Sequence, residues 1–237
     1  MRITFLGSSH GVPEANQRCT CTMVEVGGRY YLIDVGVMVI EDLRTRGIPV
    51  DAVKGIFITH MHGDHTNGLL SFADLISWYF KTADPEIFLP KAEAKGAIQA
   101  WLTVNGSKPR ELRYREVHEG LIFDDGYLKV TAIRTRHCDV SYAYLLEAEG
   151  KTVLMTGDLN KDPKTDFPAV DKDLDLLVGE AAHFSATVYA ELLSGRRVKA
   201  VIIHHTAPWN IPNIGKLSEA LADVPVTMAN DGLEITI

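Results

Sequence analysis

Three of the nine histidines in this chain of 237 residues fall close together, in the pattern H-x-H-x-D-H. They are His60, His62 and His65, and Asp64 stands among them. Imidazole nitrogens and carboxylate oxygens are ligands that zinc and related divalent metals bind in proteins. Crowding these groups together without a cation would be electrostatically unfavourable. The pattern therefore predicts a metal site.

Further candidate ligands stand at the ends of apolar segments, where strands open into loops that present side chains to solvent. His137 and Asp158 each end such a segment, and His204 and His205 end another. Successive side chains of a strand point to opposite faces, so only one of the two adjacent histidines can reach the site. We prefer His205, because it lies where the strand opens into the next loop. The same alternation turns Cys138 away from the side that His137 faces.

These side chains are more numerous than one metal ion can use, and they predict two divalent ions. His60 and His62 with a third histidine would form one site. Asp64 and His65 with a histidine from the last pair would form the other, and Asp158 is the candidate bridging carboxylate. The set favours zinc, with manganese and iron as alternatives, because it is rich in imidazole and lacks a thiolate. Two ions roughly 3.5–4 Å apart can polarise an ester or phosphoryl oxygen and hold a hydroxide at neutral pH.

The elements that must position these residues alternate between β-hairpins and helices. Alternating apolar residues around turn sequences predict hairpins over residues 21–34, 121–135 and 142–157. Helical spacing of apolar residues predicts helices over residues 38–47, 67–80, 91–106, 185–194 and 214–223. Short apolar strands are expected over residues 53–59, 86–90, 174–180 and 200–205. This order predicts an α/β (α+β) fold, a four-layer αββα sandwich of two mixed sheets with helices outside.

Composition sets wider limits on the protein. The length and the 46% hydrophobic content suit a single domain over residues 1–237. The net charge of −7 disfavours broad electrostatic binding to nucleic acid. No apolar run approaches the ~20 residues that span a membrane, and the start has no leader pattern, so we expect a cytoplasmic protein without a membrane partner. Two basic clusters are expected to be solvated faces: Arg110, Arg113 and Arg115, and Arg196, Arg197 and Lys199.

The histidine cluster resembles the signature of the metallo-β-lactamase superfamily. The sequence THMHGDH fits its H-x-H-x-D-H pattern, and LIDVG resembles the family's preceding motif, in which Asp34 would be structural. The resemblance implies a metallo-β-lactamase fold and two metal sites bridged by Asp158. The implied ligands are His60, His62 and His137 for one ion, and Asp64, His65 and His205 for the other.

The start of the chain is similar to a narrower branch of that superfamily. Residues 4–26, which contain Gly-Val-Pro, resemble the opening of ribonuclease Z and of the phosphonate-operon phosphodiesterases. The sequence GEAAHFS resembles a ribonuclease Z region in which a glutamate and a histidine flank the metals, and Glu180 and His183 would take those places. Only twenty residues separate His137 from Asp158, and a compact hairpin fills them. That leaves no room there for the arm with which ribonuclease Z grips tRNA, so tRNA 3′ processing is disfavoured.

The favoured function is that of a dinuclear metal-dependent phosphodiesterase. Its substrate would be a small molecule or a short nucleotide phosphodiester, such as a cyclic nucleotide or an RNA-like one, attacked by a hydroxide that the metals hold. Asp64 and His183 are the candidate catalytic residues, although His183 could equally be a surface histidine at a helix start. The alternatives are a lactonase or other ester hydrolase, a redox-sensing di-iron protein, and a metal-binding protein without catalysis. The oligomeric state stays open, and a homodimer is one option.

Overall fold

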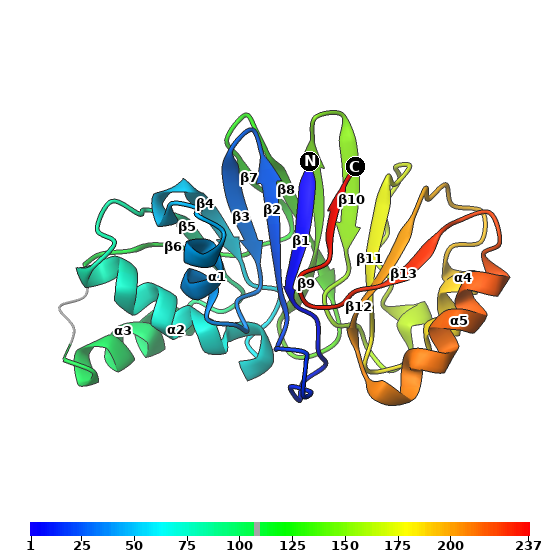
Figure 1. The fold of residues 1–237 in the computed structure, drawn as a ribbon, viewed down its shortest axis with the longest axis horizontal. Helices are drawn as coiled ribbons and strands as arrows, with labels where there is room; N and C mark the ends of the chain where they lie inside the picture. The colour runs from blue at the N-terminus through cyan, green and yellow to red at the C-terminus, as the bar shows by residue number, and fades with distance from the viewer. Residues whose placement is uncertain (107–109) are drawn as a thin grey trace.

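The computed structural model describes residues 1–106 and 110–237, and in this part of the chain two seven-stranded sheets stand face to face between two groups of helices (Figure 1). The first sheet contains β1 (Arg2–Gly7), β2 (Cys21–Val26), β3 (Arg29–Ile33), β4 (Val53–Phe57), β5 (Glu86–Leu89), β6 (Arg113–Glu116) and β14 (Glu234–Thr236). The second contains β7 (Gly120–Asp124), β8 (Lys129–Thr135), β9 (Ser141–Ala148), β10 (Lys151–Met155), β11 (Leu176–Ala181), β12 (Val201–Thr206) and β13 (Val226–Met228).

The two sheets have the same internal plan. The first runs in the order β14-β1-β2-β3-β4-β5-β6 and the second in the order β13-β12-β11-β10-β9-β8-β7. In the first sheet the pairs from β14 to β3 are antiparallel and those from β3 to β6 are parallel. In the second sheet the pairs from β7 to β10 are antiparallel and those from β10 to β13 are parallel. Parallel neighbours end at the same edge of a sheet, so each sheet gathers several strand ends at one rim.

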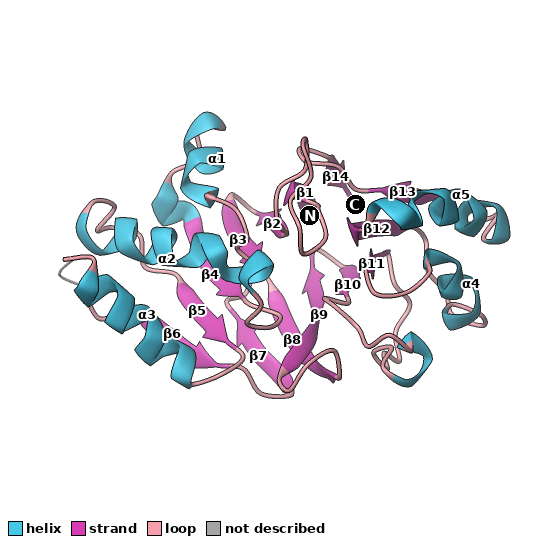
Figure 2. Cartoon of the chain, turned by 90° about the horizontal axis from the view of Figure 1, so that it is seen from below, coloured by secondary structure: helices cyan, strands magenta, loops and turns pink. Residues whose placement is uncertain are grey.

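Helices cover the outer face of each sheet, as Figures 1 and 2 show from two sides. The first sheet carries α1 (Val39–Thr45), α2 (Gly63–Trp78) and α3 (Glu93–Val104), and the second carries α4 (Tyr189–Leu192) and α5 (Ile211–Ala220). Each helix turns an apolar stripe towards its sheet, because only that face can exclude water. The predicted four-layer αββα sandwich is therefore confirmed.

Three apolar cores lie between these layers. Tyr31 packs between the two sheets with Phe57 and Tyr144, whereas its neighbour Leu32 packs under the helices of the first sheet. In the second sheet, Leu177 likewise packs beneath α4 and α5. Successive strand residues enter different cores because their side chains alternate between the two faces. This explains why the central strands are apolar without interruption.

Several elements differ from their predicted bounds. The helix predicted over residues 67–80 begins at Gly63, so that Asp64 and His65 lie in its first turn. The helix predicted over residues 185–194 is a 3-10 turn followed by the four residues of α4. Its Tyr189 packs directly on β11, where a Cβ at Gly179 would come within 2.5 Å of the tyrosine hydroxyl. That close contact, with the hydrogen bond from the Tyr189 hydroxyl to the Glu180 carbonyl, holds the segment against the sheet.

Three short strands were not predicted. β13 and β14 have three residues each, too few to show an alternating pattern. β6 is an edge strand whose Arg113 and Arg115 are exposed and pair with Glu86, so the segment presents the polar face that was expected. Charged side chains of this kind protect an open sheet edge. Pro109, at the start of this segment, lies outside the described residues.

In the described part of the chain, no helix is long and apolar enough to cross a membrane.

Candidate metal centre

His60 and His62 lie in the connection between β4 and α2, and both face the loop after β8. The His60 ring is buried and lies 4.4 Å from the His62 ring and 4.8 Å from the His137 ring, measured between centroids. His62 Nδ1 and His137 Nε2 are 3.3 Å apart. The three imidazoles thus converge on one point, where they form one of the groups that could hold a metal ion.

Asp64 and His65 occupy the first turn of α2 and face the end of β12. Asp64 Oδ2 lies 3.2 Å from His65 Nε2 and 3.7 Å from His205 Nε2. The positive end of the helix dipole favours a carboxylate at this position. His65 lowers the pKa of Asp64 to about 2 although burial acts in the opposite direction, so the group is a carboxylate at neutral pH. These three side chains form a second candidate metal group.

Asp158 lies between the two groups, three residues after β10 ends. Its Oδ2 atom is surrounded by histidine nitrogens at 3.3 to 3.8 Å. These nitrogens belong to His205 (3.3 Å), His65 (3.5 Å), His137 (3.7 Å), His60 (3.8 Å) and His183 (3.8 Å). One carboxylate oxygen is therefore within reach of both groups, which is the placement that a bridging ligand needs.

The polar atoms at the centre fit divalent cations. Among the described residues, His60 Nε2, His65 Nε2 and Asp158 Oδ1 are buried without a hydrogen-bond partner. Leaving such groups unpaired costs about 1–3 kcal/mol each. Burial lowers the pKa of His60 to about 2, so its imidazole is neutral at pH 7 and keeps a lone pair for a cation. A site of imidazoles and carboxylates without a thiolate suits zinc, manganese or iron.

A buried carboxylate from β3 orients one of these imidazoles. Asp34 Oδ2 accepts a hydrogen bond from His65 Nδ1 at 2.8 Å, which directs His65 Nε2 towards the centre. Asp34 Oδ1 also accepts one from the backbone N–H of Thr59, next to His60. Asp34 adopts a left-handed backbone conformation, with φ of 59°, at the end of its strand. Carboxylates in this role fix the tautomer and the direction of a ligating histidine.

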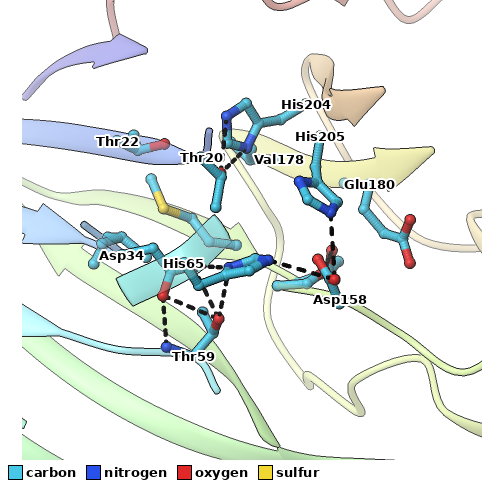
Figure 3. Close-up of a pocket in the computed structure, with 15 residues that line it drawn as sticks. Thr20, Thr22, Asp34, Thr59, His65, Asp158, Val178, Glu180, His204 and His205 are labelled. Atoms are coloured by element: carbon cyan, nitrogen blue, oxygen red, sulfur yellow. Dashed lines mark hydrogen bonds and ion pairs between the residues drawn. The ribbon is translucent and has the colours of Figure 1, made fainter. Parts of the chain in front are cut away.

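His204 and His205 point in different directions because β12 contains a bulge (Figure 3). The pairing with β11 shifts register at His205, which has a positive φ of 47°. His205 Nε2 faces Asp158, whereas His204 Nε2 donates a hydrogen bond of 2.8 Å to the Gly7 carbonyl. Burial lowers the pKa of His204 to about 4. The geometry therefore brings His205 into the centre and leaves His204 outside it, through a bulge and not through simple alternation.

A small cavity lies behind the centre, on the side that Figure 3 shows. Its volume is about 30 Å³, and Thr20, Thr59, Asp158 and His204 are among the residues that line it. That volume holds one or two water molecules and no organic substrate. His62, in contrast, is exposed.

His183 stands at the rim of the centre, two residues after β11. Its Nδ1 donates a hydrogen bond of 3.0 Å to Glu180 Oε1, and its ring lies 4.6 Å from that of His137. Burial lowers the pKa of His183, but the hydrogen bond and the charge of Glu180 outweigh it, so that the pKa is raised. The side chain is 29% exposed. His183 is thus positioned by a carboxylate and partly open to solvent.

Three other residues near the centre complete its surroundings. Cys138 is turned away, and its thiol donates a weak hydrogen bond to the Val140 carbonyl. Thr59 and Asp166 were not singled out by the sequence patterns, yet both contact the segments that carry candidate ligands. The one sequence signal that could have identified Thr59 as part of the site is its position directly before the H-x-H pattern. Asp166 is one of many aspartates on loops, and no local pattern distinguishes it.

Comparison with known proteins gives the family. A family model described as "Anti-Pycsar protein Apyc1" matches residues 1–194. That range contains every candidate ligand named above except His204 and His205.

Sequence relatives include ribonucleases Z. The chain is 30% identical to ribonuclease Z of Haloarcula marismortui over 154 residues, which cover 64% of this chain and 49% of that protein. It is 27% identical to ribonuclease Z of Pseudomonas putida over 201 residues, which cover 82% of this chain and 60% of that protein. The chain thus spans about half the length of several ribonuclease Z sequences that it matches.

Solved structures share the fold over almost the whole chain. The metallo-β-lactamase fold protein YhfI from Bacillus subtilis has a TM-score of 0.76 at 18% identity, with 99% of this chain and 98% of that chain covered. A diphosphatase from the PhnP family has a TM-score of 0.71 at 18% identity, with 100% and 97% covered. The short form of human tRNase Z has a TM-score of 0.70 at 20% identity, with 100% and 99% covered. At these identities the likeness concerns the fold alone. The solved structures thus show that the chain has the metallo-β-lactamase fold, and the family model, which spans most of the chain, shows that it belongs to the Apyc1 family.

Proposed function

We propose that this protein is a metal-dependent hydrolase with two divalent ions at the rim of its sandwich. The observation that carries the proposal is the position of Asp158, whose Oδ2 atom lies within 3.3 to 3.8 Å of histidine nitrogens from both candidate groups. Without cations this arrangement would be energetically unfavourable, because it crowds several imidazoles around one carboxylate in a buried space. With cations bound, the same carboxylate is a suitable bridge between two metal ions.

The proposed ligands divide into two sets that share Asp158. One ion would be held by His60, His62 and His137, and the other by Asp64, His65 and His205. Zinc is the favoured metal, with manganese and iron as alternatives. When bound, two such ions polarise a phosphoryl oxygen and supply a hydroxide nucleophile at neutral pH.

The proposed substrate is a small or short phosphodiester, such as a cyclic nucleotide or a short RNA. The matches to ribonuclease Z sequences and the shared fold of a PhnP-family diphosphatase support phosphoryl over carbonyl chemistry. The hairpin of β9 and β10 connects His137 to Asp158 with a tight turn at Glu149 and Gly150. No arm extends from this connection, which the structure describes in full, and the net charge of −7 also disfavours a long polyanion.

Two side chains of the centre are proposed to move protons. The bond from His183 Nδ1 to Glu180 leaves Nε2 free to face the substrate, where a protonated ring can stabilise the phosphoryl charge or give its proton to the leaving oxygen. Asp64, ionised at neutral pH, is placed to accept a proton from the attacking water. We also infer that residues 1–237 form a single domain, because strands of both sheets share one inter-sheet core.

A metal analysis combined with a substrate panel tests this function. Protein purified without chelator should contain about two metal ions per chain by elemental analysis. It should hydrolyse bis(p-nitrophenyl) phosphate, and cyclic mononucleotides or short RNA, faster than a lactone or a β-lactam. His118→Ala serves as a control, because His118 is exposed and bonds only locally, to Glu119. A reproducible content well below one ion per chain would refute the metal site, and faster turnover of the lactone would favour a lactonase.

A further inference from the structure

The short segment from Asp158 to Asn160 is connected to three other parts of the metal centre. The Leu159 carbonyl accepts a hydrogen bond of 3.3 Å from His137 Nδ1. The Leu159 N–H donates one of 3.0 Å to Glu180 Oε1, the same atom that holds His183. The Asn160 N–H donates one of 2.7 Å to Asp166 Oδ2. The position of the bridging carboxylate is thus tied to its surroundings through the backbone that follows it.

Asp166 joins this segment to the loop of His137. Its Oδ1 atom accepts a hydrogen bond of 2.6 Å from the Arg136 N–H, directly before His137, while its Oδ2 atom holds Asn160. The residue is only 7% exposed, so water offers little competition for these bonds. Hydrogen bonds to an ionised carboxylate are stronger than neutral ones. A single side chain therefore connects the backbone beside one candidate ligand to the backbone beside another.

The strands that precede these two loops are not direct neighbours in the sheet. His137 follows β8 and Asp158 follows β10, and both strands pair with β9 and not with each other. Beyond the strand ends, no backbone–backbone hydrogen bond among the described residues links the two loops. The carboxylate of Asp166 spans this gap.

We propose that Asp166 is a positioning residue that sets the distance between His137 and the bridging Asp158. This inference rests on the proposed metal function and adds to it a residue that is not itself a ligand. Loss of one of its two bonds frees the loops to separate. This weakens the binding of the ion that His137 holds more than the binding of the ion held by Asp64, His65 and His205. Losing a hydrogen-bond partner of a metal ligand typically costs roughly 10–100-fold in metal affinity.

A nearby aspartate provides a matched control. Asp162 Oδ1 accepts a bond of 3.3 Å from the Lys164 N–H and caps the 3-10 turn Pro163–Thr165 that precedes Asp166. It is exposed, and its described bonds stay within its own loop. Asp162→Asn therefore tests the general tolerance of this loop, whereas Asp166→Asn replaces one of two accepting oxygens by an amide nitrogen that cannot accept.

The experiment compares zinc and cobalt binding by the wild type, Asp166→Asn and Asp162→Asn. Metal-free proteins are titrated with Zn²⁺ against a competing chelator, and with Co²⁺ while its absorption spectrum is recorded. We expect Asp166→Asn to keep its fold by circular dichroism, to lose roughly 10–100-fold in affinity for one ion, and to show an altered Co²⁺ spectrum. Asp162→Asn should match the wild type. Added Zn²⁺ should restore kcat of Asp166→Asn on bis(p-nitrophenyl) phosphate.

The outcomes separate this inference from the proposed function. Wild-type affinities and an unchanged Co²⁺ spectrum in Asp166→Asn would overturn the positioning role and leave the metal function intact. Equal losses in both variants would also overturn it, since they would indicate general disturbance of the loop. If Asp166→Asn does not fold, Asp166→Glu, which keeps both accepting oxygens on a longer side chain, takes its place with the same expected loss for one ion. A wild type that binds no metal would overturn both proposals.

Discussion

The two sheets contribute to the metal centre in different ways. The first sheet supplies His60, His62, Asp64 and His65 from one continuous segment, which comprises the connection after β4 and the first turn of α2. The second sheet supplies one residue from each of several strand ends: His137, Asp158, His183 and His205. The first group is brought together by local backbone geometry, because a short extended segment turns directly into a helix. The second group comes together only when the second sheet is complete and packed against the first.

The difference extends to how each group is held. In the first group, His65 is oriented by Asp34, which lies at the end of the neighbouring strand β3. In the second group the loops are held to one another, because the Leu159 carbonyl accepts a hydrogen bond from His137 and the Leu159 N–H donates one to Glu180, which also binds His183. Strand ends that do not pair need such cross-links, because the ladder of hydrogen bonds stops where the loops begin. The contiguous group should therefore tolerate changes elsewhere better than the dispersed group.

The largest effect is expected from Asp158→Asn. This change removes the carboxylate charge that lies between the two groups, so affinity for both ions should fall by more than the roughly 10–100-fold that loss of a ligand's hydrogen-bond partner typically costs. His62→Ala is the comparison from the contiguous group, because His62 lies at the exposed edge and should affect one ion only. Elemental analysis and hydrolysis of bis(p-nitrophenyl) phosphate measure both. Retention of two ions and full activity in Asp158→Asn would show that Asp158 is a turn residue.

The next largest effect concerns catalysis without loss of metal. His183→Ala should keep both ions and lose roughly 10²–10⁴-fold in kcat on a phosphodiester with a poor leaving group, as expected for a positioned acid. The loss should shrink for p-nitrophenolate, which leaves without a proton. Glu180→Gln, which keeps the size of the side chain, should lower the pKa of His183 and shift the alkaline side of the pH profile to lower pH, because the acid must be protonated and its raised pKa depends on Glu180. An unchanged rate of His183→Ala on the poor leaving group would exclude the acid role.

A smaller and more selective effect is expected from the adjacent histidines of β12. His205→Ala should lower the affinity for one ion by roughly 100-fold or more, because removing a ligand costs more affinity than removing the hydrogen-bond partner of a ligand. His204→Ala should keep both ions and lose only the contacts to Gly7 and Thr20. Metal titration of the two variants under identical conditions measures the contrast. Loss of metal in His204→Ala alone would reverse the assignment.

The smallest effect concerns an ion pair between the two sheets, outside the metal centre. Asp125 accepts hydrogen bonds from Arg29 and Tyr31 of β3. Burial would raise the pKa of Asp125, but bonds from the Leu128 N–H and from these side chains outweigh it and lower the pKa. The pair therefore stabilises the fold above the unfolded pKa of about 3.9, and this stabilisation is lost as the pH falls through the lower folded value. Asp125→Asn should reduce the free energy of unfolding by about 1 kcal/mol or less at pH 7, since solvent screens a partly exposed pair.

Urea unfolding at pH 7 and at pH 3 measures this difference, with metal affinity as a second readout. The destabilisation should shrink at pH 3, and both metal affinities should match the wild type because the change lies outside the centre. An effect that grows as the pH falls would contradict the depressed pKa.

Much of the fold could be predicted from local patterns. Hairpins over residues 21–34, 121–135 and 142–157 follow from alternation and turn chemistry, and the structure confirms them. The short strands β13 and β14 could not be predicted, because three residues carry no period and their pairing depends on partners far away in the chain. The start of α2 was placed too late, since the polar residues Gly63 to His65 do not continue the apolar stripe by which helices are recognised.

The sequence by itself determined the H-x-H-x-D-H group, the alternation of hairpins and helices, and a list of candidate ligands at strand ends. These features depend on neighbours within a few residues, where side-chain type and spacing act directly on the backbone. The tertiary structure alone decided that Asp158 lies between the two groups, that a bulge turns His205 and not His204 towards them, and that Asp166 connects two unpaired loops. Each of these depends on contacts between segments distant in the chain. Such contacts form only when the sheets pack and exclude water, and no local pattern records them.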